Sequence, residues 1–233
     1  MKTDKQYRHI FFDLDETLWD FRRNSLETLH DLISHHSDVM AGVERTNFIE
    51  RYHHHNEYYW DQYRKGKINR QQLRMERWKS TLSEFNLYSE DFAKKLSDHY
   101  LEILPTKKHL YEDTIDLLTY LKPKYSLHVI TNGFEEVQHR KIETSGLAPF
   151  FTHVITSERA GSQKPQREIF LFALDLAGGT VHNSLFIGDS IEADIAGAKG
   201  VGMDHVLFNP GKILHHETVM LEIDELKELK KYI

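Results

Sequence analysis

Five short apolar runs stand out in an otherwise polar chain, and each is followed by polar residues. Within each run hydrophobic residues follow one another instead of alternating with polar ones. This pattern is typical of parallel strands that are covered on both faces. We therefore predict five buried strands, at His9–Phe12, Ser126–Ile130, His153–Ile155, Ser184–Ile187 and His205–Phe208.

Helix-like segments lie between these runs, and a glycine follows three of them. Glycine directly after a helix is a common stop signal, because it adopts the left-handed conformation at little cost. Strands that alternate with helices predict a doubly wound, mostly parallel α/β sheet of the Rossmann-like type. We predict helices at Thr114–Lys122, Glu135–Ser145, Gln166–Ala177 and Ile191–Lys199, the last three ending at Gly146, Gly178 and Gly200.

The segment between the first two strands has a different character. It contains no convincing strand but three or four helix-like stretches, including residues 45–63 and 69–85. We predict an all-helical insert, or cap, at residues 18–105, and a Rossmann-like core formed by residues 1–17 and 106–233. The insert is rich in aromatic and histidine residues. Tyr52, Tyr59 and Tyr63 follow helical spacing and are expected in its core, whereas His53 to His55 cannot share one helix face and are expected mostly in solvent.

Length and composition fit a globular protein. The 233 residues suffice for one large domain or for a core with an insert, and 39% of them are hydrophobic. No run approaches the roughly 18 apolar residues of a membrane span. The polar segment Met1 to Arg8 and the short apolar run behind it do not match a signal peptide. We therefore expect a cytoplasmic protein without a membrane partner.

The charge and the cysteine content exclude some kinds of crosslink, metal site and binding partner. There is no cysteine, which excludes disulfides and thiolate-ligated zinc. The formal net charge of −6 argues against a nucleic-acid polymer as partner, because that binding needs a broad basic face. A small phosphorylated metabolite remains compatible, since it needs only a few well-placed groups.

Two acids, Asp13 and Asp15, follow the first predicted strand, and Thr17 follows them. Ligands of open α/β sheets bind beyond the carboxyl ends of the strands. Two carboxylates so close together repel each other unless a cation or a shared proton lies between them. A calcium loop does not fit, because its sixth position, normally glycine, is Leu18 and its twelfth is Asn24.

A second acidic group follows the fourth predicted strand. Asp189 comes directly after Gly188, and Asp194 lies one turn into the next helix. Taken alone, Asp189 could be a simple helix cap. Together with Asp13 and Asp15 at another strand end, it favours an oxygen-ligated hard cation.

Two further loops carry candidates for binding an anion. Thr131, Asn132 and Gly133 lie between a strand and a helix, where free N–H groups can hold an anion, although the triplet is also an ordinary turn. Lys164 precedes Pro165, which we expect at the start of a helix. A lysine at that cap opposes the helix dipole, so it is a candidate functional residue; a solvated surface lysine is the alternative.

Taken in order, these four loops resemble the haloacid dehalogenase superfamily, whose members carry an Asp nucleophile, a Thr or Ser, a Lys and an acidic metal loop. The resemblance spans the whole chain and includes a helical cap after the first strand. It implies that Asp13 is the nucleophile and that Thr131 and Lys164 bind phosphate. It also implies a Mg²⁺ site formed by Asp13, Asp189 and the backbone carbonyl of Asp15.

The second aspartate indicates the subclass. The superfamily's dehalogenases lack it and its ion pumps carry threonine there, whereas phosphatases and sugar-phosphate mutases share the pattern of this chain. An acid at Asp15 can protonate the leaving alkoxide and then activate water against an aspartyl-phosphate. Asp194 is expected to orient Lys164 or a metal-bound water, and Thr17 to support the same site.

A finer resemblance is to 5′-nucleotidases that clear modified pyrimidine nucleotides. It lies in residues 12–25 and 131–134. It implies a nucleoside 5′-monophosphate as substrate. A sugar-phosphate or broad-specificity metabolite phosphatase is the close alternative, and a phosphomutase or a non-catalytic binding protein is more remote. The expected substrate-binding residues are Asn132, Gly133, Trp19 and Phe134, and the alternative for Trp19, as for Phe21, is that its ring only packs the hinge of the insert.

Overall fold

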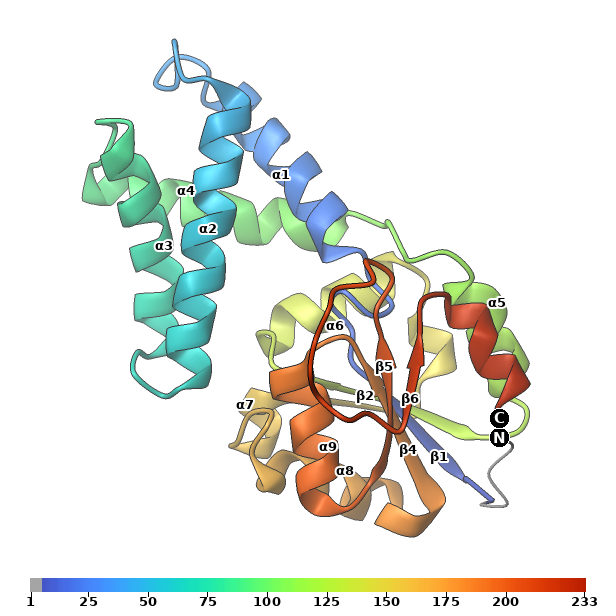
Figure 1. Ribbon diagram of the computed structural model, residues 1–233. Helices are drawn as coiled ribbons and strands as arrows, with labels where there is room; N and C mark the ends of the chain where they lie inside the picture. The colour runs from blue at the N-terminus through green and yellow to red at the C-terminus, as the bar shows by residue number, and fades with distance from the viewer. Residues whose placement is uncertain (1–5) are drawn as a thin grey trace. The chain divides into compact units, whose positions relative to one another are not determined.

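The computed structural model describes residues 6–233, which divide into two compact units (Figure 1). One unit contains residues 6–21 and 108–233, and the other contains residues 22–107. Leu18 and Trp19, which we predicted to begin the insert, therefore belong to the first unit. The first five residues of the polar N-terminal segment lie outside the described residues.

A six-stranded parallel sheet, in the order β3-β2-β1-β4-β5-β6, forms the centre of the first unit. The predicted α/β class is confirmed, and the five predicted strands differ from the observed ones by at most one residue at an end. β6 was missed, because its three residues include only one that is buried. The strands are β1 His9–Phe12, β2 Ser126–Thr131, β3 His153–Thr156, β4 Ser184–Gly188, β5 Asp204–Phe208 and β6 Leu221–Ile223.

The helices of this unit follow the predicted order, with one wrong helix stop and one short helix, α7, that was not predicted. The predicted stop at Gly200 is wrong: the helix continues to Val201, and Gly202 ends it in the left-handed conformation with φ 80°. The helix also starts with a π-helical turn, η4. The helices are α5 Thr114–Leu121, α6 Glu135–Thr144, α7 Ser157–Ala160, α8 Arg167–Ala177, η4 Ile191–Ile195 and α9 Ala196–Val201, with shorter 3₁₀ turns at η2 Ala148–Phe150, η3 Val181–Asn183 and η5 Leu226–Lys231.

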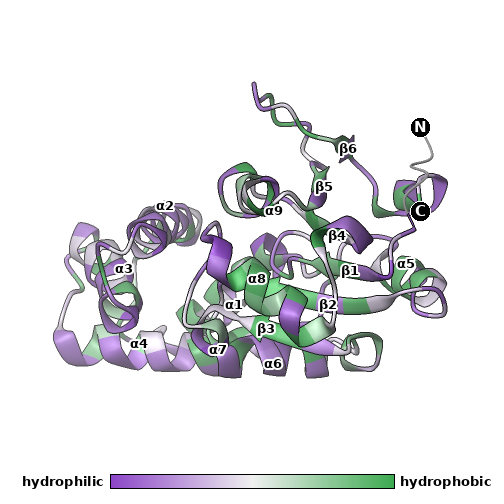
Figure 2. Cartoon of the chain, turned by 90° about the horizontal axis from the view of Figure 1, so that it is seen from below, coloured by the Kyte–Doolittle hydropathy of each residue, from purple (hydrophilic) through white to green (hydrophobic). Residues whose placement is uncertain are grey.

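The core of this unit lies between the sheet and the helices α8 and α9. Phe11 and Ile130 from the strands pack with Ile169 and Phe170 from α8 in one buried cluster. Figure 2 shows hydrophobic residues concentrated in the strands and in α8. Burial of these side chains removes apolar surface from water and holds the carboxyl ends of the strands in a fixed arrangement.

Three histidines also line the sheet, one on each of β1, β2 and β3. His128 is 1% exposed, and its ring stacks on Phe11 at 4.7 Å and on His153 at 5.4 Å. His9 Nδ1 lies 3.3 Å from His128 Nε2. Burial, assisted by the neighbouring His9 and His153, lowers the pKa of His128 to about 3. Neutral His128 is thus part of the hydrophobic packing.

We expect His128→Phe to make the protein more resistant to acid. An unfolded histidine binds a proton near its ordinary pKa of 6.5, whereas folded His128 does so only near about 3. Between these values the unfolded state binds more protons, so the free energy of unfolding falls as the pH drops. From about pH 7 to pH 4.5, the wild type should lose about 2 kcal/mol more than the variant in denaturant unfolding.

The exposed His216 provides a matched control for this prediction. His216→Phe removes a titratable ring from the surface and should follow the pH dependence of the wild type. If His128→Phe follows it too, the buried ring does not contribute to acid sensitivity.

The second unit consists of helices, as predicted, with α1 entering it from Phe21. Its helices are α1 Phe21–His35, α2 Arg45–Arg64, α3 Arg70–Glu84, α4 Glu90–Ile103 and η1 Leu104–Thr106. Asn69 caps α3 through a reciprocal capping box with Gln72, and Ser89 caps α4. These local signals explain why α3 and α4 begin where they do.

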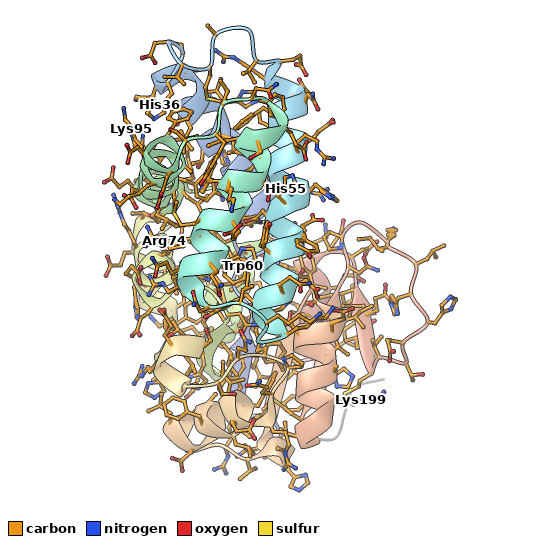
Figure 3. All side chains as sticks on the ribbon, turned by 90° about the vertical axis from the view of Figure 1, so that its left-hand side faces the viewer. His36, His55, Trp60, Arg74, Lys95 and Lys199 are labelled. Atoms are coloured by element: carbon orange, nitrogen blue, oxygen red, sulfur yellow. The ribbon has the colours of Figure 1, made fainter. Side chains whose placement is uncertain are left out.

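Aromatic rings form the core of the second unit. Tyr52, Trp78 and Tyr100 are buried and contact one another, with ring centroids 4.4 to 5.7 Å apart. Tyr59 and Tyr63, expected in the core, are only half-buried. His55, labelled in Figure 3, lies 2.7 Å from Glu84.

Among the described residues, no helix has the length and apolar character needed to cross a membrane.

Candidate active site

Asp13 lies directly beyond β1, between the carboxyl ends of β2 and β4. Its backbone N–H donates to the carbonyl of Ile187 in β4 at 2.9 Å, which fixes its position at the carboxyl ends of the strands. The chain then folds back, since Trp19 N–H donates to Leu14 O at 2.8 Å and Glu16 takes the left-handed conformation with φ 63°. Such a conformation is costly for a non-glycine residue and is common at functional sites.

A buried ammonium group contacts Asp13. Lys164 Nζ lies 2.5 Å from Asp13 Oδ1 and 2.6 Å from Asp194 Oδ1, and all three side chains are nearly inaccessible. Burial alone would lower the pKa of Lys164, but the carboxylates of Asp13 and Asp194 outweigh it and raise the pKa. Lys164 therefore stays charged, and Asp194 makes the contact expected of a residue that orients it.

Lys164 does not lie at a helix cap, so that prediction is wrong. α8 begins at Arg167, with Gln166 as its N-cap. Asn132 engages the backbone of Lys164 instead, because its amide donates to Lys164 O at 3.0 Å and its oxygen accepts from Lys164 N–H at 2.8 Å. Residues before proline also avoid the helical conformation. Asn132 thus braces the lysine loop, a role that we did not predict for it.

The loop after β2 holds Thr131 in a defined orientation. Thr131 Oγ1 accepts hydrogen bonds from Gly133 N–H at 3.2 Å and from Gln138 Nε2 at 2.7 Å. A Cβ atom at Gly133 would lie only 2.4 Å from the side chain of Gln138, so any larger residue would displace Gln138 from this position. At the start of α6, the N–H of Glu135 donates to the carboxylate of Glu158 at 2.7 Å.

The carboxylate of Asp15 turns toward α6. Gln138 Nε2 donates to its Oδ2 at 2.9 Å, and Lys141 Nζ donates to its Oδ1 at 2.7 Å. The ammonium of Lys141 also lies 4.4 Å from the ring centroid of Trp19 and 5.5 Å from that of Phe21. Sequence reasoning missed Gln138 and Lys141. The sequence feature that could have indicated them is a pair of polar residues three positions apart on the buried face of a predicted helix.

Trp19 and Phe134 are both buried, at 0% and 4% exposure. Trp19 is fixed by β-bridges to Asp15 and Leu110, and Phe134 is the N-cap residue of α6. Both rings are thus part of the packing beside the site. Their role in binding a base stays a prediction.

Three carboxylates lie close together here, and two of them, Asp13 and Asp189, belong to the metal site that we predicted. Oxygens of Asp13, Asp189 and Asp194 all lie within 4.8 Å of one another. Thr17 Oγ1 donates to Asp189 Oδ1 at 3.0 Å. Burial, with Asp194 and Asp13 nearby, raises the pKa of Asp189 well above its ordinary value. Crowded oxygen ligands of this kind fit Mg²⁺.

The contacts also separate the roles of the acids. Asp194 is already engaged, because its Oδ1 lies against Lys164 and its Oδ2 accepts from Ser190 N–H at 3.0 Å. A Cβ atom at Gly188 would lie 2.4 Å from Asp194 Oδ2, so glycine permits this close approach. Asp13 and Asp189 are therefore the better candidates to hold a cation.

Residues 7–202 match the family of haloacid dehalogenase-like hydrolases. The protein belongs to this family. The match extends over both of the units described above, and it confirms the resemblance inferred from the four loops.

The sequence matches to three curated relatives extend over most of the chain of this hydrolase. The HAD-hydrolase YfnB of Bacillus subtilis (strain 168) is 31% identical over 97% of this chain and 94% of its own length. The pyrimidine 5′-nucleotidase PynA of Streptococcus pneumoniae is 29% identical over 90% and 87%, respectively. The glyceraldehyde 3-phosphate phosphatase of Pyrococcus abyssi is 30% identical over 96% and 92%.

A solved structure of YfnB is also similar. It has a TM-score of 0.88 and 28% sequence identity, and the match covers 97% of this chain and 98% of that one. YfnB is bound to magnesium in that structure, which reveals interdomain movement in YfnB.

Proposed function

We propose that this hydrolase is a phosphatase that cleaves small phosphate monoesters with Asp13 as its nucleophile. The observation that carries the proposal is the buried contact of Asp13 with Lys164, 2.5 Å apart, at the end of the central strand β1. A carboxylate beside a buried ammonium suits an anionic nucleophile that must meet an anionic substrate. The names of PynA and the Pyrococcus phosphatase are consistent with it.

The reaction takes place in two transfers. One oxygen of Asp13 attacks phosphorus while the bond between phosphorus and the leaving-group oxygen breaks. Asp15 donates a proton to the leaving-group oxygen. Water then attacks the phosphorus of the aspartyl-phosphate, and Asp15 accepts a proton from the water. The bond between Asp13 and phosphorus breaks, which releases inorganic phosphate and restores both acids.

Positive charge makes the first approach feasible. Two like charges about 4 Å apart cost roughly 4 kcal/mol at an effective dielectric of about 20. Lys164 offsets part of this repulsion, and Thr131 would donate its hydroxyl to the phosphate. Mg²⁺, when held by Asp13, Asp189 and the backbone carbonyl of Asp15, supplies further positive charge.

Within this class we propose a nucleoside 5′-monophosphate, with a pyrimidine base, as the substrate. The similarity to PynA supports this choice. A sugar-phosphate or triose-phosphate substrate is the second candidate, and the similarity to the Pyrococcus glyceraldehyde 3-phosphate phosphatase favours it.

A panel of phosphate esters tests this proposal. Uridine and thymidine 5′-monophosphates are expected to show at least about a tenfold higher kcat/KM than glucose 6-phosphate or glycerol phosphate, a difference of about 1.4 kcal/mol in transition-state binding. The test measures released phosphate, with p-nitrophenyl phosphate as a reference for the catalytic groups alone. Higher kcat/KM values for the sugar or triose phosphates would instead favour the second candidate.

A further inference from the structure

We propose that Lys141 and Gln138 are positioning residues that hold the Asp15 carboxyl group in place for proton transfer. This inference rests on the phosphatase activity and the role of Asp15 proposed above. It assigns a task to two α6 side chains that make no hydrogen bond or ion pair with Asp13 and lie outside the four loops.

The geometry fixes both oxygens of Asp15. Gln138 donates to Oδ2 at 2.9 Å and Lys141 donates to Oδ1 at 2.7 Å. Each carboxyl oxygen has two lone pairs, so one donor on each leaves room for a transferred proton. Two donors on two oxygens stop the group from rotating, whereas a single donor would not.

The donors are themselves held rigidly. Lys141 is 2% exposed and Gln138 is fully buried. The ammonium of Lys141 lies over the rings of Trp19 and Phe21, and Gln138 also donates to Thr131 Oγ1 at 2.7 Å. The same amide therefore connects the proton-transfer residue with the hydroxyl proposed to bind phosphate.

A purely structural ion pair is the competing explanation. Buried pairs often contribute little to stability, and their replacement by apolar groups can be neutral or stabilising. Lys141→Met keeps the aliphatic stem against Trp19 and Phe21 and removes the ammonium. It leaves Asp15, whose side chain is 27% exposed, with Gln138 as its remaining donor, so some loss of stability is expected and is measured beside the kinetic effect.

The test compares leaving groups. A leaving group of high pKa needs a proton in the transition state, whereas p-nitrophenolate hardly does. We expect Lys141→Met to lower kcat/KM for phenyl phosphate and glycerol phosphate at least about tenfold more than for p-nitrophenyl phosphate. Lys141→Gln keeps a donor without the charge and should lie between Lys141→Met and the wild type.

Arg140→Met is the matched control, because Arg140 lies on the same helix and is exposed. It should leave kcat/KM unchanged for every ester. If Lys141→Met slows all esters equally, or speeds the cleavage of glycerol phosphate, the positioning role is wrong. Melting temperatures of the variants, measured alongside, separate a folding defect from a kinetic one.

A double-mutant cycle locates the effect. If Lys141 acts through Asp15, adding Lys141→Met to Asp15→Asn should slow phenyl phosphate cleavage no further. Additive losses would contradict the inference. Failure of the phosphatase proposal would look different, because the wild type would then cleave no ester or Asp13→Asn would keep its activity.

Discussion

Asp13→Asn is expected to lower phosphatase turnover by at least about a thousandfold while the fold is retained. The amide cannot attack phosphorus, so no aspartyl-phosphate can form. Lys164 keeps its contact with Asp194 at 2.6 Å, so its buried charge still has a partner in the variant. Turnover is measured by phosphate release, and the fold by circular dichroism and melting temperature.

Asp20→Asn is a suitable control, because Asp20 is half-buried in the same loop but has no proposed part in the reaction. It should retain most of the activity. If Asp13→Asn keeps more than about a tenth of the wild-type rate, the loss is under about 1.4 kcal/mol of barrier and Asp13 is not the nucleophile. Mass spectrometry of the quenched wild type should in addition detect a phosphoryl group on Asp13.

The sheet could be predicted because its strands are buried on both faces. Each such strand appears in the sequence as an uninterrupted apolar run, and β1 was located residue for residue. β6 lies beyond β5 at the edge of the sheet, with Leu221 half-buried and Glu222 exposed, so it leaves no such run. The helix stop at Gly202 was missed because Gly200 offers the same local signal, and only the three-dimensional structure distinguishes them.

The candidate site was predictable where residues lie at strand ends. Parallel strands bring their carboxyl ends together, so Asp13 and Asp189 could be expected near each other from sequence position alone. Side-chain direction could not be inferred in this way. Asn132 turns to the backbone of Lys164, and Asp15 turns to Lys141, a residue whose position on a helix gave no sign of its partner.

Removal of divalent metal is expected to abolish turnover, and Mg²⁺ is expected to restore it and to raise the melting temperature. Oxygens of Asp13, Asp189 and Asp194 lie within 4.8 Å of one another, and Lys164 contacts only Asp13 and Asp194. A divalent cation would stabilise the ionised form of this cluster. A ligand that binds only the folded state at about 100 times its Kd adds about 2.7 kcal/mol, or about 5–10 °C for a chain of this size.

Asp189→Asn separates the metal site from general salt effects. The variant loses one carboxylate from the crowded cluster, so without metal it should melt no lower than the wild type. It should nevertheless lose the rise with Mg²⁺, since an amide oxygen is a weaker ligand for a hard cation. Asp175→Asn, at an exposed position on α8, removes the same charge elsewhere and should keep both the rise and the activity. An equal rise in wild type and Asp189→Asn, or full turnover after exhaustive chelation, would show that these carboxylates hold no required metal.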